Sequence, residues 1–183
     1  MILGIDPSIT SSGLVVLHNG NVELAVSTIN KAELTIYERV KTIYQQINGI
    51  VTKTPFDLVV IEGFSFNSKS GDTDKICYLG HRIREGLEEN KKTFGTPWIE
   101  VPPTSLKKFV CNNGNAKKEL MLKEVYKRWK FDTDVNDIAD AYGLAKFGMA
   151  YLGQDSDLYA YQIETIDSLR NPKPAKKPRK KVK

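Results

Sequence analysis

Residues 2–6 read Ile2-Leu3-Gly4-Ile5-Asp6, a short apolar run that ends in a carboxylate. A second run of the same kind, Leu58-Val59-Val60-Ile61, ends in Glu62. Continuous apolar runs of this length are typical of buried strands. If the two runs are neighbouring parallel strands, their carboxyl ends lie at one edge of the sheet, where open α/β folds place their sites. We therefore expect Asp6 and Glu62 to lie close together.

The rest of the chain alternates strands with helices. Asn19-Gly20 is a strong hairpin signal, and apolar residues at spacings of three and four indicate an amphipathic helix that closes before Pro55. This order predicts an α/β fold in which a crossover helix joins the strands ending in Asp6 and Glu62. Further strands are expected at 13–17, 22–29 and 98–101, and helices at 33–51, 73–90, 104–109, 116–130 and 136–152, with Thr104 capping the third helix.

A third group of acids lies at the start of the last predicted helix: Asp132, Asp134, Asp137 and Asp140. Helical residues three apart share a face, so Asp137 pairs with either Asp134 or Asp140. Small residues around Asp140 allow this helix to pack closely on the sheet. We assign Asp137 and Asp140 to the site and keep Asp134 as a helix cap or as an alternative that lies behind the metal ligands. The helix dipole alone would also favour acids in a first turn, but it does not explain acids at two strand ends.

The predicted cluster of Asp6, Glu62, Asp137 and Asp140 needs a positive partner. Carboxylates gathered at one edge repel one another and lose solvation. A divalent metal ion is the obvious source of neutralising charge. No Cys-x-x-Cys pair or group of histidines points to zinc.

Length and composition limit the number of domains and the cellular compartment that we expect. A chain of 183 residues with 40% hydrophobic residues fits one compact domain, which we place at residues 1–169. Cys77 and Cys111 are too few for a disulfide framework, which favours a reducing, cytoplasmic compartment. No apolar run approaches the ~18 residues of a membrane span, and the first residues lack the pattern of a secretory leader. We therefore expect a soluble protein without a membrane partner.

The C-terminal segment has a different composition. Of the chain's 27 Lys and Arg residues, 8 lie in residues 170–183, which contain no Asp or Glu. Three prolines and the scarcity of apolar residues predict a disordered basic tail. Blocks of like charge of this kind contact polyanions. We expect the tail to bind DNA, with a solubilising terminus as the alternative; its candidate contacts are Lys176, Lys177, Arg179 and Lys180.

Three motifs together resemble the RuvC family of Holliday-junction resolvases, within the RNase H-like nuclease fold. They are Ile2-Leu3-Gly4-Ile5-Asp6-Pro7-Ser8, Val59-Val60-Ile61-Glu62 and Asn136-Asp137-Ile138-Ala139-Asp140-Ala141. The likeness runs in register over residues 1–152. It implies an RNase H-like mixed five-stranded sheet flanked by helices. Because phage resolvases of this length also carry basic tails, we expect a phage-type member.

The same resemblance implies an activity. RuvC relatives are Mg²⁺-dependent endonucleases, usually homodimers, that nick opposing strands of a four-way junction, and we expect Mn²⁺ to substitute. Position by position, the match carries Asp6, Glu62, Asp137 and Asp140 to the family's catalytic, metal-binding acids. Two ions roughly 4 Å apart would activate a water and stabilise the leaving 3′ oxygen. The expected partner is branched DNA, in the cytoplasm of a bacterium or of a phage-infected host.

The resemblance also implies DNA contacts in the body of the protein. Lys107 and Lys118 fall where the family has DNA-contacting lysines, although an ordinary solvated face would also carry them. The family has an aromatic residue after the strand-end glutamate that stacks on a base at the crossover. Here Phe64 and Phe66 flank that position, so either is a candidate for stacking, worth about 1–3 kcal/mol. Either can instead belong to the core. We expect structure-selective cutting with relaxed sequence preference.

Other functions share parts of this pattern. An RNase H-like nuclease that cuts RNA–DNA hybrids would use the same acids. An actin-like ATP-binding module shares the Gly-Ile-Asp start, but it needs a second phosphate loop and about twice this length. A non-enzymatic DNA-binding protein would explain the lysines and the tail, but it would leave the acids without a purpose.

Overall fold

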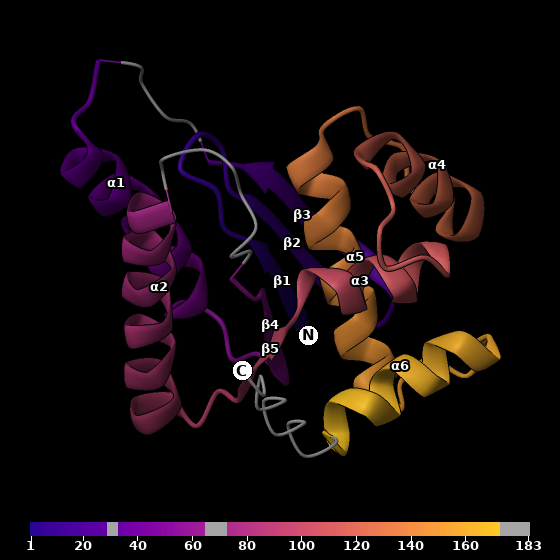
Figure 1. Cartoon of the computed structure of the whole chain (residues 1–183). Coiled ribbons are helices and arrows are strands. Elements are labelled where there is room, and N and C mark those ends of the chain that lie inside the picture. Colours follow the sequence, from indigo (N-terminus) through magenta and orange to yellow (C-terminus); the bar gives the residue numbers. More distant parts are fainter. Residues whose placement is uncertain (29–32, 65–72, 173–183) are drawn as a thin grey trace, which may run out of the picture.

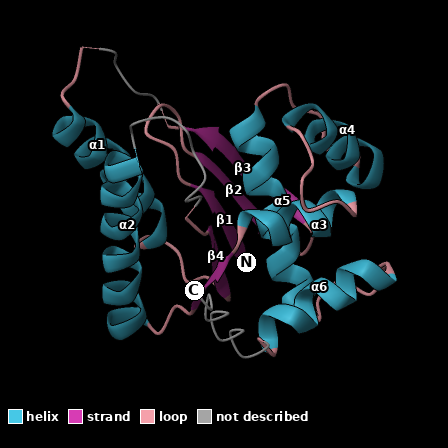
Figure 2. Ribbon diagram, in the orientation of Figure 1, coloured by secondary structure: helices cyan, strands magenta, loops and turns pink. Residues whose placement is uncertain are grey.

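The computed structural model describes residues 1–28, 33–64 and 73–172. These residues form a five-stranded mixed sheet with helices on both faces (Figures 1 and 2), so the predicted fold class is confirmed. The strands are β1 (Ile2–Asp6), β2 (Gly13–His18), β3 (Asn21–Ser27), β4 (Leu58–Glu62) and β5 (Trp98–Val101). The helices are α1 (Ile36–Val51), α2 (Thr73–Phe94), α3 (Pro103–Cys111), α4 (Lys118–Trp129), α5 (Asn136–Tyr151) and α6 (Ala160–Arg170). Among the described helices, none combines the length and apolar character needed to cross a membrane.

Strand β1 lies at the centre of the sheet. The strand order is β3-β2-β1-β4-β5, and β1 pairs antiparallel with β2 and parallel with β4. The parallel pair aligns Ile5 with Ile61, so Asp6 and Glu62 follow at the same edge of the sheet. The prediction that these two strands are parallel neighbours is therefore confirmed.

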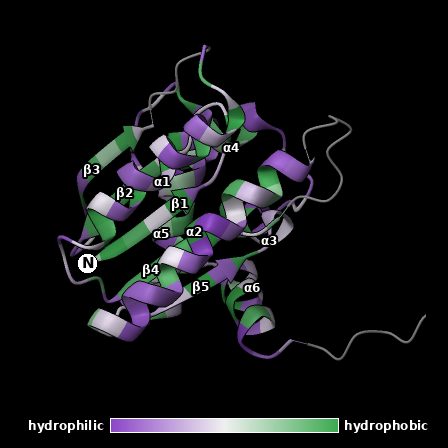
Figure 3. Cartoon of the chain, turned by 90° about the vertical axis from the view of Figure 1, so that its left-hand side faces the viewer, coloured by the Kyte–Doolittle hydropathy of each residue, from purple (hydrophilic) through white to green (hydrophobic). Residues whose placement is uncertain are grey.

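The sheet separates two apolar cores. Leu3 and Ile5 pack with α1 and α2 on one face, whereas Ile2 and Val60 pack with α3, α4, α5 and α6 on the other. The two groups of helices lie on opposite sides of the sheet in Figure 1. Figure 3 shows hydrophobic colours along β1 and many hydrophilic residues along the outer helix α2. Because β1 is covered on both faces, it reads as a continuous apolar run instead of an alternating one.

Helix α5 lies directly on the sheet, with backbone against backbone. A β-carbon added to Gly4 would lie 2.0 Å from the carbonyl oxygen of Ala141. One added to Gly13 would lie 1.9 Å from the carbonyl oxygen of Asp137. Both distances are too short for any side chain, so glycine is required at both positions. This contact fixes the first turns of α5 against the edge where β1 ends.

Two helix starts differ from the sequence-based predictions. Helix α3 begins at Pro103 without a side-chain cap, so the prediction that Thr104 caps it is wrong. Proline suits the first helical position because its missing N–H would have no partner there. Helix α5 begins at Asn136 after Val135, again without a side-chain cap. The prediction of Asp134 as its cap is therefore also wrong.

Helix α6 was not predicted from the sequence. Its buried residues include Gln162, whose side-chain nitrogen donates to the carbonyl oxygen of Phe109 in α3 at 3.1 Å. Its last residue is Arg170, which donates to the carbonyl oxygen of Tyr151. The helix therefore includes the first residue of the segment 170–183 that was predicted as the basic tail. Two of its three buried residues, Gln162 and Thr165, are polar, so the helix has no continuous apolar stripe for a sequence pattern to reveal.

The close approach of α5 leads to a stability prediction. Gly4→Ala should lower the free energy of unfolding by about 3 kcal/mol, the upper end of the usual cost of overpacking, because its β-carbon meets the backbone of α5. The matched control is Gly49→Ala within α1, where an added β-carbon has nothing within 4 Å. That variant should gain about 0.5–1 kcal/mol because alanine favours the helix. Urea denaturation measures both; equal stabilities of the two variants would contradict the packing described.

Candidate active site

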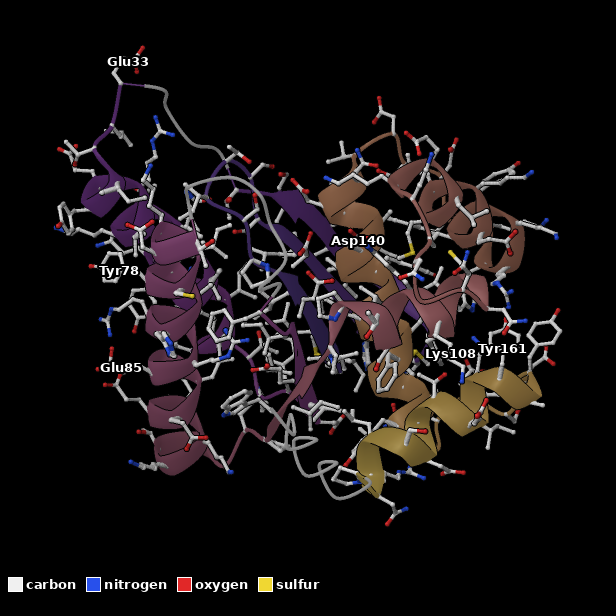
Figure 4. The ribbon with its side chains drawn as sticks, viewed as in Figure 1. Glu33, Tyr78, Glu85, Lys108, Asp140 and Tyr161 are labelled. Carbon is white, nitrogen blue, oxygen red and sulfur yellow. The ribbon has the colours of Figure 1, made fainter. Side chains whose placement is uncertain are left out.

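Three elements bring the predicted acids to one edge of the sheet. Asp6 ends β1, Glu62 ends β4, and Asp137 and Asp140 lie in the first turns of α5, where Figure 4 labels Asp140. Asp6 is only 7% exposed. Burial raises the pKa of Asp6 well above its usual value, and the negative charges of Glu62, Asp140 and Asp137 raise it further. The structure therefore brings together the four acids that the sequence selected.

The carboxyl groups of Asp6 and Glu62 lie close enough to interact directly. A hydrogen bond between their carboxyl groups contributes to raising the pKa of Asp6 and to lowering that of Glu62. A hydrogen bond between two carboxyl groups needs a proton between them, and that proton partly relieves the repulsion of neighbouring carboxylates.

Burial and neighbouring charges also shift the pKa values of Glu62 and Asp140. Burial, aided by the charge of Asp140, raises the pKa of Glu62 to about 7. Burial raises the pKa of Asp140 to about 6, although Lys118 and Lys107 oppose this shift. The same two lysines also lower the pKa of Glu62. Lys107 of α3 and Lys118 of α4 are therefore close enough to the acids to act on them electrostatically.

The donor set fits a hard divalent cation. Its side chains supply only carboxylate oxygens, the ligands that Mg²⁺ and Mn²⁺ prefer, and the buried Asp6 has three acidic neighbours to neutralise. Among the described residues, no group of three or more His, Cys, Asp or Glu side chains already has the arrangement of a metal site. The side chains would therefore have to rotate to converge on an ion, while their backbones already meet at one edge.

Comparison with known proteins identifies the family. The family model for the crossover junction endodeoxyribonuclease RuvC matches residues 2–146. The chain belongs to the RuvC family. RuvC from Ehrlichia ruminantium is 27% identical over 154 residues, which cover 79% of this chain and 92% of the relative. RuvC from Prochlorococcus marinus is 30% identical over 156 residues, which cover 81% and 97%.

A solved structure shows the shared fold. RuvC from Thermus thermophilus superposes with a TM-score of 0.65 at 20% identity, over 84% of this chain and 96% of that one. The recognition of a RuvC-family chain with an RNase H-like fold is thus confirmed. The expectation of a phage-type member finds no support in the comparisons.

The remaining candidate residues of this RuvC-family chain have different surroundings or lie outside the described residues. The ring of Phe64 lies 5.0 Å from that of His81 and 4.1 Å from the guanidinium of Arg84, both on α2, so Phe64 packs against this helix. Asp134 is exposed and is not among the charges that shift the pKa of Asp6, Glu62 or Asp140. The remaining candidates lie outside the described residues: Phe66, Lys176, Lys177, Arg179 and Lys180.

One residue beside the site was missed by sequence reasoning. The Nη2 atom of Arg84 donates to the main-chain carbonyl oxygen of Glu62 at 3.0 Å. In sequence, Arg84 is one of many charged residues along α2, and no motif marks it. Its low side-chain exposure of 12% separates it from its solvent-facing neighbours, and exposure is known only from the fold.

The raised pKa values predict how stability depends on pH without metal. Between pH 5 and 7.5 the folded chain holds protons on Glu62 and Asp140 that the unfolded chain has released, because their folded pKa values are about 7 and about 6. The contribution of these groups to stability therefore falls as pH rises through this window. Glu62→Gln removes part of this penalty, so its stability advantage over wild type should grow from pH 5 to pH 7.5. The expected growth is on the order of 1–3 kcal/mol, since one pKa unit corresponds to about 1.4 kcal/mol.

Urea unfolding in EDTA at several pH values measures this difference. The control is Asp134→Asn, which removes an exposed carboxylate of the same helix region and should show a stability difference from wild type that does not grow with pH. A constant difference between Glu62→Gln and wild type would contradict the assignment of Glu62 to a buried acidic cluster.

Proposed function

We propose that this RuvC-family chain is a divalent-metal-dependent endonuclease that nicks four-way DNA junctions and other branched DNA. The observation that carries the proposal is the meeting of Asp6, Glu62 and Asp140 at one sheet edge with Lys107 and Lys118 beside them. The family's description as a crossover junction endodeoxyribonuclease supports the reaction. The structure of Thermus thermophilus RuvC in complex with a Holliday junction substrate supports the choice of DNA.

In this proposal the four acids hold Mg²⁺, for which Mn²⁺ substitutes. Bound divalent ions supply an activated water and charge stabilisation for in-line displacement at phosphorus. The chain supplies the geometry: β1 and β4 fix the backbones of Asp6 and Glu62, and α5 adds Asp137 and Asp140. Lys107 and Lys118 place positive charge where the phosphate of the cut strand would approach.

We further propose that the protein acts as a cytoplasmic homodimer. Two acidic sites, one per protomer, would then face opposing strands of the junction. With Phe64 packed on α2, Phe66 is the better candidate for stacking on a base at the crossover. The basic tail would add contacts to phosphates on the duplex arms.

Substitution of the acids tests the proposed site. Asp6→Asn, Glu62→Gln, Asp137→Asn and Asp140→Asn should each reduce junction nicking by at least about 100-fold, because two-metal chemistry needs these carboxylates. Junction binding in Ca²⁺ should persist because phosphates are held by lysines. The matched control Asp134→Asn should nick at the wild-type rate. Full activity of Asp137→Asn together with loss in Asp134→Asn would show that the other pair of aspartates serves the site.

A set of substrates tests the proposed specificity. Purified protein with Mg²⁺ should nick a labelled four-way junction and a fork in preference to linear duplex, with paired symmetric nicks in the junction. An RNA–DNA hybrid should remain intact. Cutting of the hybrid with no cutting of the junction would instead identify an RNase H-like activity.

Removal of residues 173–183 tests the basic tail. These residues carry 7 of the 27 Lys and Arg residues and follow the end of α6, so the deletion leaves every described element intact. If half of these cations contact phosphate, the slope of log affinity against log salt should become shallower by about 3. Junction and duplex binding should weaken alike, as measured by fluorescence anisotropy. An unchanged salt slope would refute a DNA-binding tail.

A further inference from the structure

All three guanidinium nitrogens of Arg84 make hydrogen bonds beside the candidate active site. Its Nε donates to Oε2 of Glu100 at 2.7 Å, and its Nη1 donates to the carbonyl oxygen of Gly80 at 2.9 Å. Its Nη2 donates to the carbonyl oxygen of Glu62 at 3.0 Å. The guanidinium therefore joins α2 to the ends of β4 and β5. Such a fork of bonds has a defined geometry, which a single ammonium group cannot reproduce.

Two glycines make room for this arrangement. A β-carbon on Gly80 would lie 2.3 Å from a ring carbon of Phe64 and 3.0 Å from Nη1 of Arg84. A β-carbon on Gly63 would lie 2.9 Å from Oε1 of Glu100. The ring of Phe64 lies against α2 with the Arg84 guanidinium 4.1 Å from its centroid. The cluster of Arg84, Glu100 and Phe64 is thus tightly packed where two residues lack side chains.

The carbonyl that Arg84 binds belongs to the residue whose carboxyl group meets Asp6. Strand β4 ends at Glu62, and one more backbone bond follows, from the N–H of Gly63 to the carbonyl oxygen of Val101 at 2.8 Å. The peptide between Glu62 and Gly63 is therefore fixed on one side by β5 and on the other by Arg84. These two bonds hold the end of β4 in place at the Glu62 α-carbon, from which the Glu62 side chain extends.

We propose that Arg84, oriented by Glu100, is a positioning residue that fixes the Glu62–Gly63 peptide and so holds the end of β4 in place, which lets the Glu62 carboxylate reach a divalent cation from a fixed α-carbon. In this proposal Arg84 acts through the backbone of Glu62. Its effect on nicking rests on the proposed nuclease function. Its effect on the peptide does not.

The test compares variants of Arg84 with a variant of a neighbouring arginine. Arg84→Met keeps the length of the side chain without its donors, Arg84→Lys keeps the charge, and Glu100→Gln keeps an acceptor for Nε. The matched control is Arg82→Met, two residues earlier on α2. Arg82 pairs with Glu85, which Figure 4 shows on the outer side of the helix, away from the sheet.

Three measurements are made on the full-length chain. Calorimetric titration with Mn²⁺ reports metal affinity without DNA, and amide hydrogen exchange at Gly63 reports the peptide itself. Single-turnover nicking of a four-way junction is compared with junction affinity in Ca²⁺. Arg84→Met and Arg84→Lys should weaken Mn²⁺ binding by about 10–100-fold, the usual effect of losing a residue that orients a metal ligand. Excess Mn²⁺ should partly restore nicking, junction affinity should be unchanged, and Gly63 should exchange faster.

Glu100→Gln should change the same quantities in the same direction by a smaller factor, and Arg82→Met should match wild type. Wild-type Mn²⁺ affinity and Gly63 exchange in folded Arg84→Met would overturn the inference, as would equal losses in Arg82→Met. If Arg84→Met does not fold, Arg84→Lys and Glu100→Gln decide by the same criterion. If the wild-type chain neither binds Mn²⁺ nor nicks junctions, the proposed function fails. Gly63 exchange then tests only the contact with the peptide: faster exchange in the Arg84 variants supports the fixing of the Glu62–Gly63 peptide by Arg84, and unchanged exchange refutes it.

Discussion

The contact between the backbone of α5 and the backbones of β1 and β2 is the constraint on which the rest of the structure depends. It exists because Gly4 and Gly13 have no side chains where Ala141 and Asp137 approach. A helix standing further off, as a β-carbon would require, would carry its acids away from Asp6. The same contact closes one of the two apolar cores, so the stability of the fold and the assembly of the acidic site have a common origin.

The acidic cluster lowers the stability of the fold that supports it. Burial penalises the charged forms of Asp6, Glu62 and Asp140, and mutual repulsion adds to the penalty. Lys107 and Lys118 offset only part of it. Burial of apolar side chains on the two faces of the sheet offsets this penalty. The cluster remains unfavourable as long as no cation neutralises it. Side chains that lower stability are expected where a protein places its functional groups.

The sequence predicted the parts of the molecule that depend on regular patterns. The parallel pair of strands and the acids at its edge followed from two apolar runs, and the choice of Asp137 and Asp140 followed from helical spacing and from small neighbouring residues. Sequence patterns did not predict α6, which is anchored in part through polar groups such as Gln162. They also did not single out Arg84, whose partners come from two strands and its own helix. Such contacts join residues distant in sequence, and no local periodicity reports them.

The acids of the site come from the beginning, the middle and the last third of the chain: Asp6 on β1, Glu62 on β4 and Asp140 on α5. No fragment that ends before α5 holds the complete set, and the strands alone lack the helix that completes it. During synthesis, a chain still emerging from the ribosome therefore lacks the complete acidic cluster until nearly all of residues 1–151 have been made and folded. Long-range assembly of this kind slows folding. It also ties the first appearance of the complete acidic cluster to the finished fold.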